Sequence, residues 1–265
     1  MSEIFVKLSR LQQIMFKFID KPNLPENKVA HCVINEKAVQ AINYLNNSGV
    51  HTLKVSENDL LENEIAAHAD LHFLYCGKEL AVIAPNQTLL IEEVKELGCR
   101  VEVAEFTPFS PYPNDVLLNQ AFINDCLLLK TDSTSKKVLE LIADNEFRLI
   151  NTKQGYAKCS VCIVSDKAII TEDNGIATLL KNYQFDVLKI KSDCIHLSDK
   201  HFGFLGGASG KISKNEIFFN GNLEEHPDFL NIKSFLNNYN IVPVYSKTYK
   251  LTDIGSIIPV TEICK

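Results

Sequence analysis

The sequence predicts an α/β protein built from five copies of one strand–strand–helix–strand unit, arranged as a pseudo-symmetric five-bladed propeller. Of its 265 residues, 46% are hydrophobic and 23% are charged, which suffices for a large buried core. Short apolar runs of strand length alternate with amphipathic runs of helix length. This pattern returns at intervals of roughly 45 residues, a period typical of repeat architectures.

Four units follow one another along the chain. Each begins with two apolar strands joined by a tight polar turn, such as Gly77-Lys78 or Asn124-Asp125. A helix and a further strand complete the unit, and Gly98 is typical of the residue that ends such a helix. The four units are predicted over residues 68–105, 114–152, 157–192 and 203–246.

The fifth unit is split between the two ends of the chain. Residues 28–55 supply two strands and a helix, and residues 251–263 supply the remaining strand. Pairing these ends closes the ring and leaves no free sheet edge. We therefore expect one domain over 28–265, preceded by an N-terminal extension, 1–27, with a helical pattern at residues 8–16.

Charge and composition exclude several classes of function. The net charge is −6 and the chain has no basic run, so nucleic acid is not expected as a partner. No apolar stretch reaches the length of a membrane span, and the opening residues lack a signal-peptide core, so we expect a cytoplasmic protein with no membrane contact. The composition says nothing about oligomeric state.

The cysteines predict neither disulfides nor a metal site. Eight cysteines in this length are too sparse for a disulfide scaffold. Cys159 and Cys162 lie three apart in an apparently extended run, where side chains point to opposite faces and do not share one metal. No cofactor is expected.

The glycine-rich residues 201–213 raise the possibility of a phosphate loop. Gly210-Lys211 is followed by Ile212, and Leu205 stands where a P-loop or a dinucleotide fingerprint requires glycine. Both motifs therefore fail. Two alternatives stay open for Gly206 and Gly207: close packing near the ring axis, or a ligand-binding wall with exposed amides.

Five such units with joined ends resemble the pentein fold of arginine deiminases, dimethylarginine hydrolases, amidinotransferases and a ribosome anti-association factor. The resemblance covers roughly residues 28–263. The strings "YPNDVLLN", "GYAKCSVCIV", "GFLGGASG" and "LTDIGSIIPV" are also similar to an uncharacterised bacterial family of this fold. That family implies no reaction.

The ring predicts a pocket at its axis, because the first strand of each blade begins there. Carboxylates, a lysine, and amide or hydroxyl groups at these points suit a small cationic or zwitterionic ligand. Any one of them also has a structural alternative, since Asp and Asn often cap turns. The predicted ligand-binding residues are Asp70, Asn114, Asp115, Asn119, Lys158, Gly206, Gly207, Ser209, Asp253 and Ser256.

Pentein enzymes imply a cysteine nucleophile on the last strand, a proton-carrying histidine and acidic residues that hold the cation. Here Gly255 or Ser256 stands where that cysteine is expected, and Cys264 comes too late. Cys159 is the candidate for a displaced nucleophile, with an adjacent lysine that would lower its pKa. The alternative is a buried, inert thiol.

Three functions follow from these observations. The first is non-covalent binding of a small molecule in the axial pocket, which the missing terminal cysteine favours. The second is an enzyme acting on a guanidino or related amino compound, with Cys159 as nucleophile, His68 or His201 as proton carrier, and Asp70 and Asp115 as cation clamp. The third is a protein-interaction module like the ribosome-binding relative.

Overall fold

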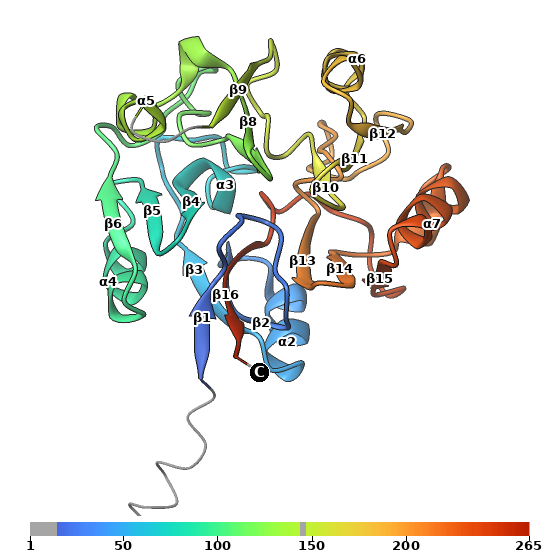
Figure 1. The fold of residues 1–265 in the computed structure, drawn as a ribbon, viewed down its shortest axis with the longest axis horizontal. Helices are drawn as coiled ribbons and strands as arrows, with labels where there is room; N and C mark the ends of the chain where they lie inside the picture. The colour runs from blue at the N-terminus through green and yellow to red at the C-terminus, as the bar shows by residue number, and fades with distance from the viewer. Residues whose placement is uncertain (1–14, 144–146, 265) are drawn as a thin grey trace, which may run out of the picture.

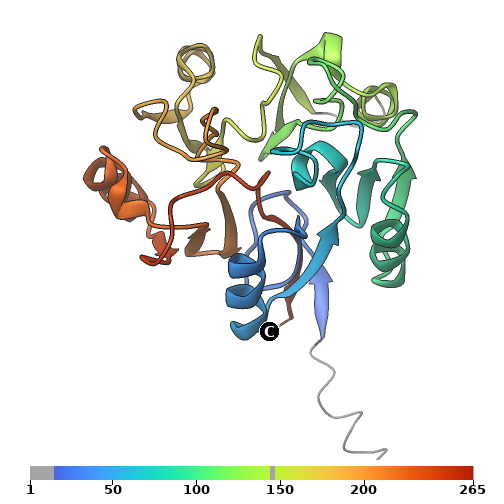
Figure 2. The ribbon, with the colours of Figure 1, turned by 180° about the vertical axis from the view of Figure 1, so that it is seen from behind.

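In the described part of the chain, five small sheets lie around a common centre, with the longer helices on the outside (Figures 1 and 2). The structure is a computed structural model that describes residues 15–143 and 147–264. Four of the sheets contain three strands and one contains four. The α/β class predicted from the sequence is confirmed.

Each three-stranded sheet has the predicted order of elements. Two strands form an antiparallel hairpin, and the third returns through a helix to pair in parallel. The sheets are β4 (Phe73–Gly77), β5 (Leu80–Ile83) and β6 (Arg100–Val103); β7 (Ala121–Ile123), β8 (Cys126–Leu129) and β9 (Arg148–Asn151); β10 (Cys162–Ile163), β11 (Ala168–Thr171) and β12 (Asp186–Lys189); β13 (Ser209–Ser213), β14 (Glu216–Phe219) and β15 (Val242–Tyr245).

The four-stranded sheet joins the two ends of the chain in the order β1-β16-β2-β3. Its strands are β1 (Phe16–Phe18), β16 (Ile258–Ile263), β2 (Val29–Asn35) and β3 (His51–Val55). Part of the expected N-terminal extension is therefore a strand, β1, paired with β16. The helix expected at residues 8–16 falls mainly outside the described residues, and Phe16 itself lies in β1.

The helices owe their position to one apolar face. In α4 (Thr88–Glu96), Leu90 and Val94 are buried four residues apart, and the chain leaves the helix through Gly98 at a φ of 95°. The helices that return to the parallel strands are α2 (Val39–Asn47), α4, α5 (Lys136–Ala143), α6 (Asn174–Asn182) and α7 (Phe229–Asn238). None of the helices in the described ranges is long and apolar enough to cross a membrane.

Neighbouring sheets are joined by shared apolar clusters. Ile123 and Ile150 pack with Ile163 and Ile169 from the next sheet, for example. Residues of β13–β15 similarly share clusters with the sheet before them and with the sheet that holds the chain ends. Burial of apolar surface between sheets is what holds them together.

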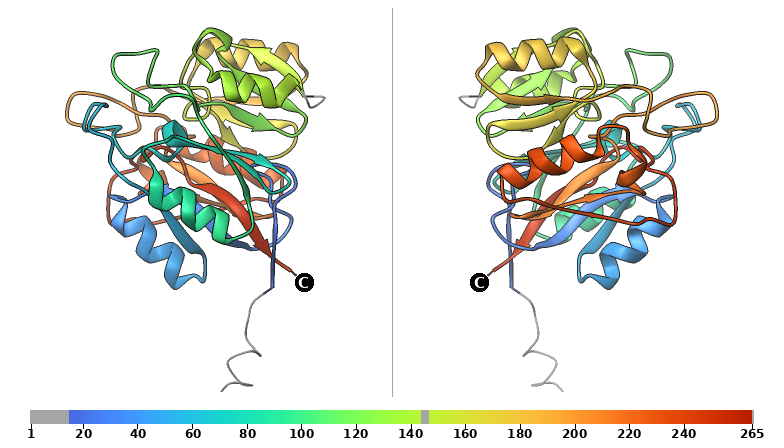
Figure 3. Two further views of the ribbon diagram at one scale, coloured as in Figure 1. Left: turned by 90° about the vertical axis from the view of Figure 1, so that its left-hand side faces the viewer. Right: turned by 90° about the vertical axis from the view of Figure 1, so that its right-hand side faces the viewer.

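The connections between successive sheets position the candidate site. They comprise residues 56–72, which include the short helix α3 (Ala69–His72), and residues 104–120, 152–161, 190–208 and 246–257. Several of these loops project from the same side of the molecule in Figure 3. Each connection leads back to the start of a sheet, where most of the predicted site residues lie.

Candidate functional site

A buried polar cluster forms where all five connections end. Each connection supplies at least one side chain or backbone group to it, and its side-chain members are between 0% and 6% exposed. We call the following residues the central cluster: His68, Asp70, Asn119, Lys158, Cys159, Asp253 and Ser256. The structure thus brings together the predicted residues of the first, second, third and last connections.

Ser256 links an acid and a base inside the cluster. Its hydroxyl lies 2.6 Å from Asp70 Oδ2, to which it donates, and accepts a hydrogen bond of 3.1 Å from Lys158 Nζ. The residue has a φ of 71°, which is uncommon outside glycine. The backbone just before β16 is therefore shaped to hold this hydroxyl between Asp70 and Lys158.

Cys159 is held by two partners. Its thiol donates to Asp70 Oδ2 at 3.0 Å and accepts from Asn119 Nδ2 at 3.3 Å. The Asn119 carboxamide oxygen accepts from the backbone N–H of Lys158 at 2.8 Å, which fixes the turn that carries both residues. The cysteine lies in this turn before β10, rather than at the start of a strand as the sequence suggested.

The expectation that Lys158 would lower the pKa of Cys159 is wrong in direction. Burial raises the pKa of the thiol well above its usual value, and the nearby Asp70 carboxyl raises it further. A thiolate in this position would lose its hydration and face a negative neighbour. Cys159 is therefore a neutral hydrogen-bond donor at neutral pH, which is unlike an activated nucleophile.

This gives a labelling prediction. In the folded protein at pH 7, iodoacetamide should modify the partly exposed Cys194 and Cys264 long before Cys159, because the Cys159 thiol is buried and its raised pKa keeps it protonated. Mass spectrometry of peptides from a time course measures the order. In urea the three should react at similar rates. Faster labelling of Cys159 in the folded protein would contradict the prediction.

His68 and Asp253 form the other half of the cluster. His68 Nδ1 lies 3.9 Å from Asp253 Oδ1, and burial lowers the pKa of His68 to about 4, so the ring is neutral. Burial raises the pKa of Asp253 to about 6, although its oxygens accept from the backbone N–H groups of Phe204 and Gly255, both at 2.9 Å. These two bonds fix the carboxyl group against the loop before β13.

Two polar atoms of the cluster have no hydrogen-bond partner. They are His68 Nε2 and Asp70 Oδ1, and both are fully buried. Burial also raises the pKa of Asp70. Buried polar atoms are normally paired, so an unpaired imidazole nitrogen and an unpaired carboxyl oxygen in one cluster call for an explanation.

Gly206 and Gly207 are packed closely against the cluster. A Cβ on Gly207 would lie 2.0 Å from Asp253 Oδ1, and one on Gly206 would lie 2.4 Å from the carbonyl oxygen of Cys159. The Gly207 N–H donates to that same carbonyl at 2.8 Å. Of the two alternatives left open by the sequence, these contacts favour close packing. Ser209 is also buried nearby, and its hydroxyl lies 3.4 Å from the Gly206 carbonyl oxygen.

Three candidates lie outside the central cluster. His201 is exposed, with its ring nitrogen 3.4 Å from both Glu64 and Ser198. The Asn114 side chain donates to the Pro111 carbonyl at the surface. Asp115 is buried, but its partner is the Tyr156 hydroxyl. The expected convergence therefore fails for His201 and Asn114, because their loops extend beyond the cluster.

Tyr156 and Glu172 were not predicted as site residues. Tyr156 contacts Asp115 and lies beside Phe204. Glu172 accepts from the Leu205 N–H at 2.8 Å, its second oxygen is buried without a partner, and burial raises its pKa to about 8. No local signal distinguishes this glutamate from an ordinary loop acid, because the backbone group that it binds lies 33 residues away.

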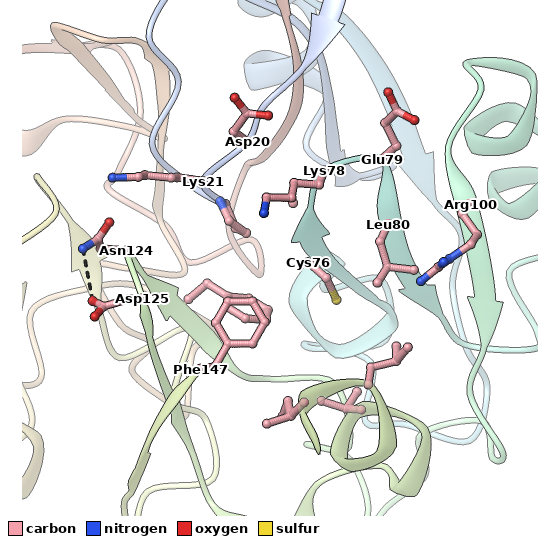
Figure 4. Close-up of a pocket in the computed structure, with 16 residues that line it drawn as sticks. Asp20, Lys21, Cys76, Lys78, Glu79, Leu80, Arg100, Asn124, Asp125 and Phe147 are labelled. Atoms are coloured by element: carbon pink, nitrogen blue, oxygen red, sulfur yellow. Dashed lines mark hydrogen bonds between the residues drawn. The ribbon is translucent and has the colours of Figure 1, made fainter. Parts of the chain in front are cut away.

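A surface cavity of about 470 Å³ lies apart from the central cluster, between the β4–β6 and β7–β9 sheets. Figure 4 shows Arg100 and Leu80 on one side of it and Asn124 with Asp125 on the other. Its lining includes apolar residues such as Leu80 and Phe147, together with lysines, an arginine and acids such as Glu79. None of the predicted site residues lines this cavity. Its mixture of acidic and basic residues does not favour a ligand of either charge.

Solved structures of similar fold include a DDAH, an agmatine deiminase and an amidinotransferase. A cysteine-to-serine variant of DDAH from Pseudomonas aeruginosa, complexed with citrulline, is 9% identical, with a TM-score of 0.56 over 88% of this chain and 99% of that chain. A cysteine-to-serine C. jejuni agmatine deiminase with substrate bound is 10% identical, with a TM-score of 0.57 over 94% and 98% of the two chains.

The inosamine-phosphate amidinotransferase of Streptomyces griseus is 8% identical, with a TM-score of 0.57 over 91% of this chain and 94% of that chain. These likenesses establish the pentein fold that the sequence pattern indicated. No curated protein matches the sequence. Residues 33–258 match a family described as a family of unknown function, DUF6873. The chain belongs to this uncharacterised family.

Proposed function

We propose that the central cluster binds a small molecule with a guanidino or amino group, without covalent attack by the protein. The observation that carries this proposal is the buried, unpaired Asp70 Oδ1. A cationic N–H donor is the partner that such an oxygen lacks. The unpaired His68 Nε2 is a second polar contact for a zwitterionic ligand.

The charges of the cluster favour a cation. The carboxyl groups of Asp70 and Asp253 share one nearby ammonium group, Lys158, and burial raises the pKa of both acids. A second positive charge would allow both to ionise, and a buried charge is stable only when it is paired. Ligand binding is therefore expected to be coupled to proton release from these acids.

The absence of covalent chemistry is inferred from Ser256. It lies just before β16, where the pentein resemblance expects the nucleophilic cysteine. Two of the similar solved structures are cysteine-to-serine variants that hold citrulline or substrate. A natural serine in the corresponding region is in keeping with a site that retains its ligand. The neutral, buried thiol of Cys159 adds no reason to expect a substitute nucleophile.

Ligand entry requires the covering loops to separate. The 56–72 and 104–120 connections are joined by hydrogen bonds from Ser110 N to the Leu60 carbonyl, 2.8 Å, and from Asn58 Nδ2 to the Pro108 carbonyl, 2.7 Å. Connecting loops open locally more readily than strands within sheets. We infer that the closed cluster is the resting arrangement and that these loops move to admit the ligand.

The test is calorimetric titration of the full chain with arginine, agmatine, citrulline and ornithine, in buffer containing a chelator. At least one compound should bind saturably, and Asp70→Asn should weaken it at least tenfold, or about 1.4 kcal/mol. Asp166→Asn, in the exposed β10–β11 turn, is the matched control and should leave affinity unchanged. Melting curves verify that both variants fold. No binding by the unaltered chain, or equal binding by Asp70→Asn, would refute the proposal.

Other expectations from the sequence remain predictions. The likeness to solved enzymes supports the alternative that this protein is an enzyme at the level of the fold. The raised pKa of Cys159 weighs against Cys159 as its nucleophile. The shared apolar clusters and the paired chain ends support closure of the sheets into a five-bladed propeller. The domain boundary at residue 28 and a cytoplasmic location remain to be tested, and no described contact favours an interaction module.

A further inference from the structure

His68, Asp70 and Cys159 offer three different metal-binding groups at one point. An imidazole nitrogen, a carboxyl oxygen and a thiol sulfur, one from each, all lie within 4.8 Å of one another. His68 and Asp70 come from the start of α3, and Cys159 comes from the turn before β10. All three side chains are at most 3% exposed.

The histidine is oriented as metal-binding histidines commonly are. Its Nδ1 faces the Asp253 carboxyl group at 3.9 Å, while Nε2 is buried without a partner. In metal sites one ring nitrogen binds the ion and the other is directed at a carboxylate, which sets the tautomer and ring orientation. Asp70 repeats this asymmetry, because Oδ2 accepts two hydrogen bonds and Oδ1 accepts none.

From this arrangement we infer that His68, Asp70 and Cys159 form a binding site for a divalent transition metal of the Zn²⁺ class. Thiolate, imidazole and carboxylate together are typical ligands of Zn²⁺ and its neighbours, whereas Mg²⁺ and Ca²⁺ take oxygen ligands. On binding, the S–H bond of Cys159 breaks, the metal–sulfur bond forms and the proton leaves to solvent, as does any proton held by the Asp70 carboxyl group. The thiolate and Asp70 carboxylate then balance the two charges of the metal.

This inference does not depend on the proposed small-molecule ligand, although both would use Asp70. Three protein ligands leave a fourth position open in a tetrahedral site, as in catalytic rather than structural zinc sites. A small polar molecule could occupy that position. Metal and organic cation are therefore tested separately, the latter in the presence of a chelator.

Cobalt(II) is the probe, because a tetrahedral cobalt–thiolate complex absorbs in the visible and near ultraviolet. The reduced full-length protein is titrated with CoCl₂ after chelator removal. We expect saturation at one equivalent with a sulfur-to-cobalt charge-transfer band, and release of at least one proton per bound metal in weakly buffered solution. Zn²⁺ added afterwards should abolish the band by displacement.

Cys159→Ser is the main variant, because a hydroxyl preserves a hydrogen-bond donor to Asp70. It should lose the charge-transfer band and bind cobalt at least tenfold more weakly, and His68→Gln should weaken binding similarly. Cys162→Ser is the matched control, because this buried thiol lies in the adjacent β10 and should leave the spectrum unchanged. Melting curves of the metal-free proteins separate loss of a ligand from loss of the fold.

No band with the folded protein, or a band that survives in Cys159→Ser, would overturn the metal site. If Cys159→Ser fails to fold, His68→Gln and the proton-release measurement decide the question. Ligand binding in chelator without a cobalt band would leave the proposed function standing and the metal site refuted. A cobalt band without ligand binding would support the metal site and refute the proposed function.

Discussion

Gly207→Ala should destabilise the protein by about 3 kcal/mol. The new Cβ would lie 2.0 Å from Asp253 Oδ1, far inside van der Waals contact. Asp253 is not free to withdraw, since it accepts hydrogen bonds from the N–H groups of Phe204 and Gly255. Relief of the clash must therefore disrupt the carboxyl group or the loop that precedes β13.

Urea denaturation followed by circular dichroism measures this change. Gly175→Ala is the control, because Gly175 lies in α6 at an ordinary negative φ, with its nearest new contact at 3.1 Å from the Asp173 carboxyl group. There alanine should change the free energy of unfolding by no more than about 1 kcal/mol. If the two substitutions changed the free energy of unfolding equally, the contact between Gly207 and Asp253 would not be rigid.

The second large effect is a pH dependence that comes from Glu172. Burial raises its pKa in the folded protein from 4.5 to about 8. Between these values the folded state retains a proton that the unfolded state has lost, so the free energy of unfolding falls as pH rises towards 8. Glu172→Gln removes this titration and keeps an oxygen to accept from Leu205 N–H.

Glu172→Gln should therefore be more stable than the unaltered protein at pH 9, by about 2 kcal/mol or more, and the gain should shrink at pH 5. Asp253 is present in both proteins, and its own raised pKa changes the stability of each in the same direction; its charge also contributes to the raised pKa of Glu172. Urea midpoints at several pH values give the comparison. Glu92→Gln, on the exposed side of α4, is the control. A difference independent of pH would contradict the assignment.

Local patterns in the sequence predicted most of the architecture. The strands β4 and β5 and the turn at Gly77 follow from an apolar–polar–apolar pattern, and α4 follows from apolar residues at helical spacing. The same period located Asp70, Lys158 and Asp253 at equivalent points of three different units, and these three do meet at the centre. Position in a repeat was therefore a useful guide to proximity.

The sequence could not predict burial by distant segments. His201 lies just before the fourth unit, but its loop carries it to the surface, whereas the ordinary-looking Glu172 is buried and accepts from the backbone N–H of Leu205. Cys159 follows a lysine in sequence, yet the ammonium of Lys158 turns to Ser256 and the thiol turns to Asp70. Neighbours in sequence thus acquired different partners in space.

Hydrophobic periodicity, turn residues and repeat length by themselves determined the α/β class, the order of elements and the join between the chain ends, because these depend on interactions within one unit. Only the tertiary structure decided which atoms in the central cluster are paired, which acids have a raised pKa and why position 207 has no space for a side chain. Those properties depend on desolvation and close contact among five segments far apart in sequence, and no single segment carries a pattern for them.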